Sequence, residues 1–194
     1  MVRTGFIAVA LLLVLVGCDD ASVPVAQQQP TEPPAQTWPL EWLVEEGSCQ
    51  NTETKILLAN AINLITWADP EGCELAAGTW QGWGSDMQLP LNLTLVVPLV
   101  TPLHALEHGA DDWSEEEKIA FINDHDNLII LDPVSAQERA NLGPALWVPL
   151  QRYWCQYASR WQQVKQRYQL TSDSDELGAL QYMLEQCPAK EGTE

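Results

Sequence analysis

Two histidines four residues apart, His104 and His108, are the side chains whose spacing could support metal chemistry. In a helix, residues at i and i+4 lie on one face, so both imidazoles could reach the same ion. Asp111 and Asp112 follow closely and could add carboxylate oxygens. The alternative is that His104 is a surface residue and His108 packs beside Gly109, because histidine pairs at this spacing often occur by chance. The sequence alone leaves both interpretations open.

The third histidine, His125, stands in the segment Asn123-Asp124-His125-Asp126, which is typical of a turn. We expect His125 to be a capping or solvated residue. The sequence contains no glycine-rich phosphate loop and no Ser/His/Asp set in a recognisable context. We therefore expect no cofactor, unless a divalent metal such as magnesium binds at a site built from the histidines.

The N-terminal segment predicts export. Arg3 precedes an apolar run, residues 5–16, which is too short to cross a bilayer as a helix. The run ends in Leu15-Val16-Gly17-Cys18, the form of a bacterial lipobox, so residues 1–17 are predicted to be a lipoprotein signal peptide and Cys18 to be acylated. An ordinary signal peptide or an uncleaved anchor is the alternative.

The predicted signal peptide has consequences for location. Residues 18–37 are rich in proline, glutamine and alanine and predict a flexible tether. A domain is then expected over residues 38–194, facing the periplasm of a bacterial cell envelope and held at the membrane by its lipid. Asp19 resembles the residue that keeps enterobacterial lipoproteins at the inner membrane, so that membrane is favoured.

Export also changes how the cysteines are interpreted, because disulfides form in oxidising compartments. Apart from Cys18, the chain contains Cys49, Cys73, Cys155 and Cys187, which allow three pairings. We favour Cys49–Cys73 and Cys155–Cys187, the two nearer pairs. No Cys-x-x-Cys pair is present, which argues against a zinc site.

The charge of the chain argues against tight binding to DNA. The sequence has 9 basic and 27 acidic residues, a net charge of −18, and cleavage after residue 17 would remove one further positive charge. Nucleic-acid binding draws most of its affinity from lysine and arginine. The one modest basic cluster consists of Arg152, Arg160, Lys165 and Arg167. We therefore expect an unknown protein partner and no nucleic acid.

Apolar spacing and capping residues predict an α+β domain. We expect helices over residues 51–67, 115–123, 152–169 and 173–186, and strands over residues 89–99 and 128–131. Ser114 followed by Glu117 predicts a capping box at the start of the second helix.

Several short motifs occur together in an order that resembles a known family. They are His108-Gly109-Ala110-x-x-Trp113, Phe121-x-Asn123-Asp124-x-x-Asn127-Leu128 and Gly143-Pro144-x-x-Trp147-x-Pro149, flanked by Cys49, Cys73 and Cys155. This order is similar to the HNH-type nuclease domain at the C-terminus of GmrSD-like restriction enzymes, which also occurs in small secreted bacterial proteins. The resemblance covers about residues 49–187 and implies an HNH-like ββα core with flanking helices, in a single domain held by two disulfides.

The resemblance also implies a site, and the sequence departs from it. An HNH nuclease uses a histidine as general base and neighbouring donors to hold a divalent metal. The family's Asp-His pair corresponds here to Thr94 and Leu95, and the family's second donor corresponds to Ala136. Only Asn127, which matches the family's orienting asparagine, is retained. Leucine cannot act as a base, so we expect no HNH hydrolysis.

Two functions follow from this conflict, and the acidic surface suggests a third, in which the protein mimics nucleic acid or binds a basic partner. The first is a catalytically inactive HNH-like lipoprotein that acts as a binding or scaffolding protein in the cell envelope. The alternative is an active metal-dependent endonuclease whose site has moved to His104, His108 or His125 and nearby aspartates. Whether the chain is an enzyme is therefore undecided by sequence, and its loss of the Asp-His pair favours the first function.

Overall fold

The computed structural model describes residue 38 and residues 41–188. These residues belong to one compact unit, which spans residues 37–194. The predicted signal peptide, the predicted acylation at Cys18, Asp19 and the predicted tether lie outside the described residues. None of the described helices is long and apolar enough to cross a membrane.

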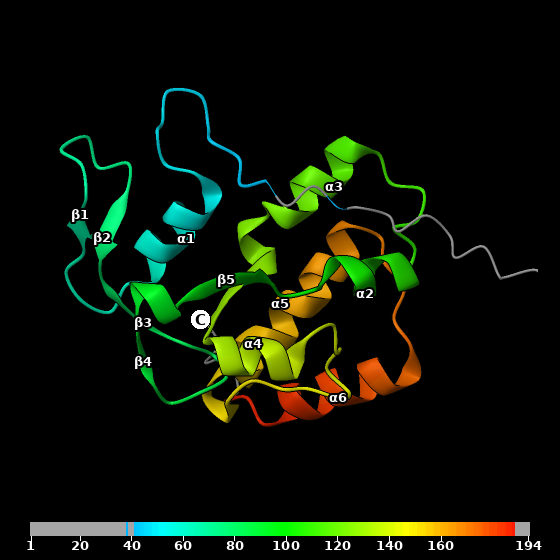
Figure 1. Cartoon of the computed structure of the whole chain (residues 1–194). Coiled ribbons are helices and arrows are strands. Elements are labelled where there is room, and N and C mark those ends of the chain that lie inside the picture. Colours follow the sequence, from blue (N-terminus) through cyan, green and yellow to red (C-terminus); the bar gives the residue numbers. More distant parts are fainter. Residues whose placement is uncertain (1–37, 39–40, 189–194) are drawn as a thin grey trace, which may run out of the picture. The chain divides into compact units, whose positions relative to one another are not determined.

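The unit combines short helices with three two-stranded antiparallel pairs, so the predicted α+β class is confirmed. The pairs are β1–β2, β3–β4 and β5–β6 (Figure 1). The strands are β1 (Thr66–Trp67), β2 (Leu75–Ala77), β3 (Thr79–Gln81), β4 (Gln88–Pro90), β5 (Leu95–Pro98) and β6 (Leu128–Leu131). The α-helices are α1 (Thr52–Asn60), α2 (Pro102–Glu107), α3 (Glu115–Ile122), α4 (Pro133–Arg139), α5 (Trp154–Arg167) and α6 (Ser174–Glu185).

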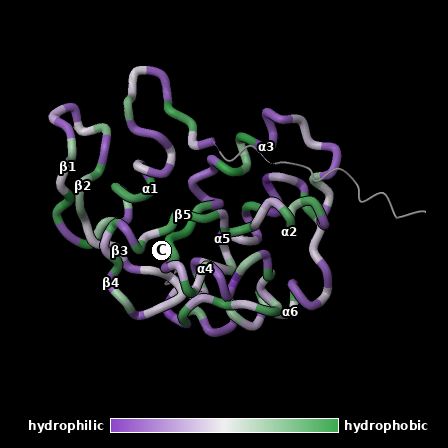
Figure 2. Tube along the Cα trace, in the orientation of Figure 1, coloured by the Kyte–Doolittle hydropathy of each residue, from purple (hydrophilic) through white to green (hydrophobic). Residues whose placement is uncertain are grey.

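The central feature is a strand–strand–helix arrangement made by β5, β6 and α4. Leu95 pairs with Leu131 and Pro98 with Leu128, so the two strands run antiparallel over their whole length. All four residues of β6 are buried, and the trace along β5 is hydrophobic in Figure 2. Helix α4 follows β6 directly and packs against β5. The chain between the strands forms α2, α3 and the short 3₁₀ helix η2 (His125–Asn127).

Asp132, the residue before α4, caps the helix and stabilises its start. One oxygen of its carboxylate accepts hydrogen bonds from the backbone N–H groups of Val134 and Ser135, as an N-cap residue does. The other oxygen accepts from the hydroxyls of Ser85 and Ser135. Burial alone would raise the pKa of Asp132, but these hydrogen bonds outweigh burial and lower it. Both oxygens of the carboxylate therefore accept hydrogen bonds that hold the start of α4 in place.

Two groups of buried apolar side chains form the core. The larger group lies among β6, α2, α3, α5 and α6, and includes Phe121, Tyr157 and Trp161. The smaller group joins α1 to the β3–β4 pair around Trp80, whose indole N–H donates to the carbonyl of Leu57 at 2.7 Å. The core therefore holds α2 against α5 and α6, the three helices that build the candidate site.

Both expected disulfides are present. Cys49 is bonded to Cys73, which joins the segment before α1 to the segment before β2. Cys155 on α5 is bonded to Cys187, just after α6, so the two helices are tied together. The pairing favoured from the sequence is confirmed.

Two predicted elements are wrong in extent. The helix expected over residues 51–67 ends at Asn60, because Ala61 takes an extended conformation and pairs with Trp80. The strand expected over residues 89–99 is divided into β4 and β5 by the 3₁₀ helix η1 (Leu91–Leu93). The hydroxyl of Thr94 donates to the carbonyl of Pro90 at 2.8 Å and closes that turn.

The helices predicted near the C-terminus are close to those observed. The expected helix over residues 152–169 is a 3₁₀ turn, η3 (Gln151–Tyr153), followed by α5. Helix α6 matches the expected helix over residues 173–186, and α3 has the predicted capping box of Ser114 and Glu117.

Candidate functional site

Helix α2 brings His104 and His108 together. Thr101 caps the helix by accepting a hydrogen bond from the backbone N–H of His104, and Pro102 takes the first helical position. The two imidazole rings stack with their centroids 4.2 Å apart. His108 ends the helix, and its carbonyl accepts from the backbone N–H of Thr171 at 2.9 Å. That bond holds the end of α2 beside the segment between α5 and α6.

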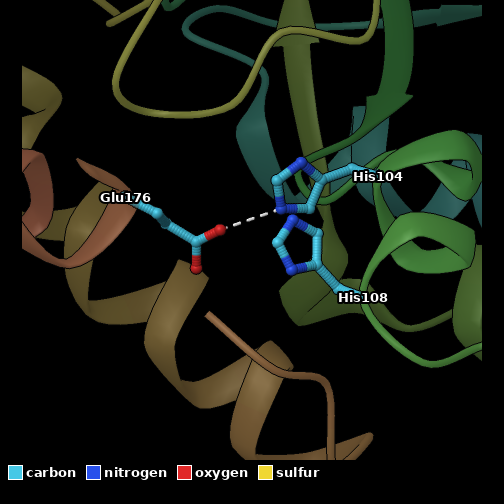
Figure 3. Close-up of side chains that lie close together, drawn as sticks. All are labelled: His104, His108 and Glu176. Carbon is cyan, nitrogen blue, oxygen red and sulfur yellow. Dashed lines mark hydrogen bonds and ion pairs between the residues drawn. The ribbon is translucent and has the colours of Figure 1, made fainter. Parts of the chain in front are cut away.

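A carboxylate and an ammonium from the two C-terminal helices meet His104. Glu176 lies in the first turn of α6, and its Oε2 is 2.9 Å from Nε2 of His104 (Figure 3). Lys165, in the last turn of α5, places Nζ 2.9 Å from the same Oε2 and 3.1 Å from the same Nε2. All three side chains are buried. A fourth contact comes from the hydroxyl of Ser172, which donates to Oε1 of Glu176 at 2.5 Å.

These contacts set the ionisation of the group. Burial alone would raise the pKa of Glu176, but hydrogen bonds from His104, Ser172 and Lys165 outweigh burial and lower it to about 2. Burial lowers the pKa of Lys165, and the neighbouring carboxylate partly opposes that effect. Burial also lowers the pKa of His108, and the charge of Lys165 lowers it further. Glu176 is therefore an ionised carboxylate at neutral pH.

His104, His108 and Glu176 are the group of donors that could hold a metal ion. Their ligand atoms lie within 4.8 Å of one another, and two imidazoles with a carboxylate suit zinc, nickel or copper. The ammonium of Lys165, however, already contacts the two atoms that would face the ion, Nε2 of His104 and Oε2 of Glu176. An ion would have to displace this buried cation. The donor types fit a metal, but the present arrangement is a completed ion-pair network.

The structure divides the residues predicted for metal binding. His104 and His108 do come together, whereas Asp111 and Asp112 are exposed in the turn before α3 and do not belong to the group of donors. His125 is exposed at the start of η2, as expected of a solvated residue. The expectation that His104 is a surface residue is wrong, because Glu176 and Lys165 cover it.

Sequence reasoning missed Glu176 and the role of Lys165. They lie 72 and 61 residues from His104 along the chain, so no spacing connects them. Asp173 caps α6 by accepting from the backbone N–H of Glu176, which makes Glu176 look like an ordinary first-turn acid. The sequence did offer one signal for Lys165. The apolar face of α5 continues through Val164 into Lys165, which indicates that this lysine is buried.

The positions expected to correspond to the HNH donors carry no catalytic group. Thr94 is buried, and its hydroxyl donates a hydrogen bond to the carbonyl of Pro90. Leu95 begins β5 with a side chain that is 39% exposed. Ala136 lies on α4 and packs against the larger core group. None of these three side chains can act as a general base, and none supplies the imidazole or carboxylate of an HNH site.

Asn127 is fully buried and its amide holds the chain together. Its Oδ1 accepts from the backbone N–H of Val100 at 2.7 Å, and its Nδ2 donates to the carbonyls of Val100 and Phe121 at 3.3 and 3.1 Å. These bonds connect the residue before β6 to the segment after β5 and to α3. The amide has a structural role in this chain.

Comparison with known proteins gives one informative relative. The chain is 31% identical over 154 residues to an uncharacterized secreted protein of Arthroderma benhamiae, an alignment that covers 75% of this chain and 72% of the relative. The chain belongs to the family of this secreted protein. No model of an established protein family matches the sequence, and no solved structure matches it significantly.

Membership of this secreted-protein family agrees with the chemistry of the cysteines. Two disulfides join the four described cysteines, which is typical of proteins that fold in an oxidising compartment. The secreted relative and the disulfides together indicate an extracellular or envelope location.

Proposed function

We propose that this chain is a non-catalytic binding or scaffolding protein of the cell envelope, built on an HNH-like ββα core. The observation that carries the proposal is the chemistry of the three positions where an HNH nuclease has its donors. Thr94, Leu95 and Ala136 offer neither a general base nor a carboxylate ligand, and they belong to or adjoin the β5–β6–α4 arrangement, which has the strand–strand–helix order expected of an HNH core. A scaffold of this kind without reactive groups is suited to binding.

The arrangement of basic side chains supports this proposal, because a nuclease needs cations that face the phosphates. All four side chains of the predicted basic cluster already have partners among the described residues of this chain. Arg152, Lys165 and Arg167 form ion pairs with carboxylates of this chain. Arg160 donates to the backbone carbonyls of His125, Asp126 and Leu128. With a net charge of −18, the protein therefore repels a nucleic-acid backbone.

The proposal includes attachment to the membrane through an acyl chain on Cys18, with Asp19 favouring the inner membrane of a bacterium. The lipobox-like segment supports it. Expression of the full chain in a bacterial host, with the Cys18→Ser variant as control, tests it by mass spectrometry. The wild-type protein should carry the acyl mass and sediment with membranes, and the variant should lose both. An unmodified wild-type protein would show that the signal peptide is an ordinary one.

A plasmid-cleavage assay tests the absence of catalysis. The chain from residue 19 onward, incubated with magnesium, manganese, zinc or nickel, should leave supercoiled DNA intact. Robust cutting that a chelator abolishes would refute the proposal. Because contaminating nucleases also cut plasmids, any activity must be compared with the His104→Ala/His108→Ala variant purified in the same way.

The second candidate function is a metal-dependent endonuclease with a relocated site. The meeting of His104, His108 and Glu176 favours it, since these donors suit a divalent ion. This function requires Lys165 to leave the site, and it requires cutting that the His104→Ala/His108→Ala variant loses. Unchanged cutting by that variant would exclude a nuclease built on these histidines.

A further inference from the structure

A cavity of about 430 Å³ opens beside the His104–Glu176 pair, among α2, the segment after α4, and the start of α6. Its size is within the range of ligand pockets. Three leucines contribute to its walls, Leu103 from α2 and Leu142 and Leu146 from the segment after α4. Leu103 is 45% exposed and Leu146 is 75% exposed. Scattered exposed leucines are ordinary on a protein surface, but here they line one cavity.

The polar part of the cavity is acidic. Glu107, Asp173 and Asp175 line it and are exposed, and none of the three forms an ion pair with another described residue. Glu176 also contributes to the lining, but its charge is balanced by Lys165 beneath it. The cavity therefore combines apolar walls with unpaired negative charge.

Gly143 lets the chain after α4 approach the buried histidine. A Cβ at this position would come within 3.0 Å of Cε1 of His104. The close approach keeps Leu142 and Leu146 beside α2, so the apolar and acidic walls belong to one hollow. Because His104 is fixed by Glu176 and Lys165, this hollow is preorganised by the ion-pair network.

We propose that this cavity binds a lysine or arginine side chain in a basic segment of a partner protein. Such side chains have an aliphatic stem that packs on apolar surface and a cationic head that stays in polar surroundings. The leucines fit the stem, and Glu107, Asp173 and Asp175 fit the head. The net charge of −18 attracts a basic segment over long range and repels phosphate groups. This inference rests on the proposed binding function and specifies its partner.

Methyl NMR of the chain from residue 19 onward tests the proposal with a defined probe, the peptide acetyl-Gly-Leu-Lys-Leu-Gly-amide. Titration should shift the methyl signals of Leu103, Leu142 and Leu146. The same peptide with norleucine in place of lysine keeps the stem and lacks the charge, so it should bind about 10-fold more weakly. Equal binding of the norleucine peptide would refute the role of the acids.

A matched pair of variants separates the cavity from the general field of the protein. Glu107→Gln/Asp175→Asn removes two charges at the cavity, and Asp111→Asn/Asp112→Asn removes two exposed charges that do not line it. The first variant should weaken peptide binding about 10-fold, whereas the second should change it less than about 2-fold. Equal weakening by both variants would overturn the proposal.

Two further outcomes are informative. Spermidine that binds as tightly as the peptide would overturn the commitment to a protein partner, because a free amine would then be sufficient. Absence of peptide binding, with DNA left intact in the plasmid assay, would refute this cavity as the binding site and leave the proposed non-catalytic function standing. DNA cutting with peptide binding retained would refute the proposed function alone.

Discussion

Replacement of Glu176 by glutamine is the sharpest test of the buried network. Glutamine keeps the shape of the side chain and can still contact His104 and Ser172, but it removes the negative charge. Lys165 would then remain buried as a cation without its carboxylate partner. Removing one member of a buried ion pair is more costly than removing an exposed charge, because the remaining charge has lost both water and partner.

The structure sets the expected magnitude. The pKa of the Glu176 carboxyl falls from 4.5 to about 2 in the folded protein, which corresponds to about 3 kcal/mol of stability at neutral pH. Because the folded pKa is the lower one, this stability is present in full above pH 4.5 and is lost as the pH falls from 4.5 to about 2. Burial of the Lys165 ammonium costs free energy in the wild-type protein, and this cost offsets part of the stability that the Glu176 carboxylate contributes.

Equilibrium unfolding in urea, followed by tryptophan fluorescence, measures the effect. At pH 7 the Glu176→Gln variant should be about 3 kcal/mol less stable than the wild type, equivalent to a fall of about 10 °C in Tm. At pH 3 the difference should shrink to roughly half that value, because the wild-type carboxyl is then losing its advantage. Asp175→Asn, an exposed change in the same helical turn, serves as the control and should cost less than about 0.5 kcal/mol.

Two results would refute this reasoning. A difference of the same size at pH 7 and pH 3 would mean that glutamine destabilises the protein by packing and not by charge. A difference below about 1 kcal/mol at pH 7 would mean that solvent reaches the group and screens it.

Three other changes test the scaffold. Asn127→Ala leaves a buried backbone N–H and two carbonyls without their partner and should cost about 3 kcal/mol in urea unfolding, whereas Asn141→Ala, on the surface, should cost less than about 0.5 kcal/mol. Loss of the Cys155–Cys187 bridge in a double alanine variant should lower the free energy of unfolding by about 3–4 kcal/mol, because the bridge closes a long loop and so restricts the unfolded chain. An unchanged midpoint of urea unfolding would contradict this. Gly84→Ala should lower Tm by several degrees, because a Cβ there would overlap the side chain of Ser135 in α4. An unchanged Tm would show that the loop containing Gly84 moves away without cost.

Local features of the fold were predictable because they depend on neighbours in the chain. Ser114 and Glu117 satisfy each other's backbone groups at the start of α3, whatever surrounds them. The uninterrupted apolar run of β6 is buried on both faces, as its composition predicts. The two nearer cysteine pairs were favoured on spacing, and export made disulfides the expected chemistry.

The limits of α1 and β5 were not predictable in the same way. The apolar spacing around α1 continues past Asn60, yet pairing of Ala61 with Trp80 ends the helix and leaves Leu64 93% exposed. Such a pairing connects segments that are distant in sequence, so a helical pattern cannot anticipate it. The division of the strand at η1 likewise depends on how β4 pairs with β3 before the chain turns into β5.

The candidate site shows the same division. The sequence by itself determined that His104 and His108 stand four residues apart, that Thr94, Leu95 and Ala136 carry neither an imidazole nor a carboxylate, and that the chain is strongly acidic. Only the tertiary structure decided what faces His104, because α5 and α6 bring Lys165 and Glu176 to it from distant parts of the chain. The physical reason is that a buried charge is stable only beside a partner, and packing of the helices, not spacing along the chain, selects that partner.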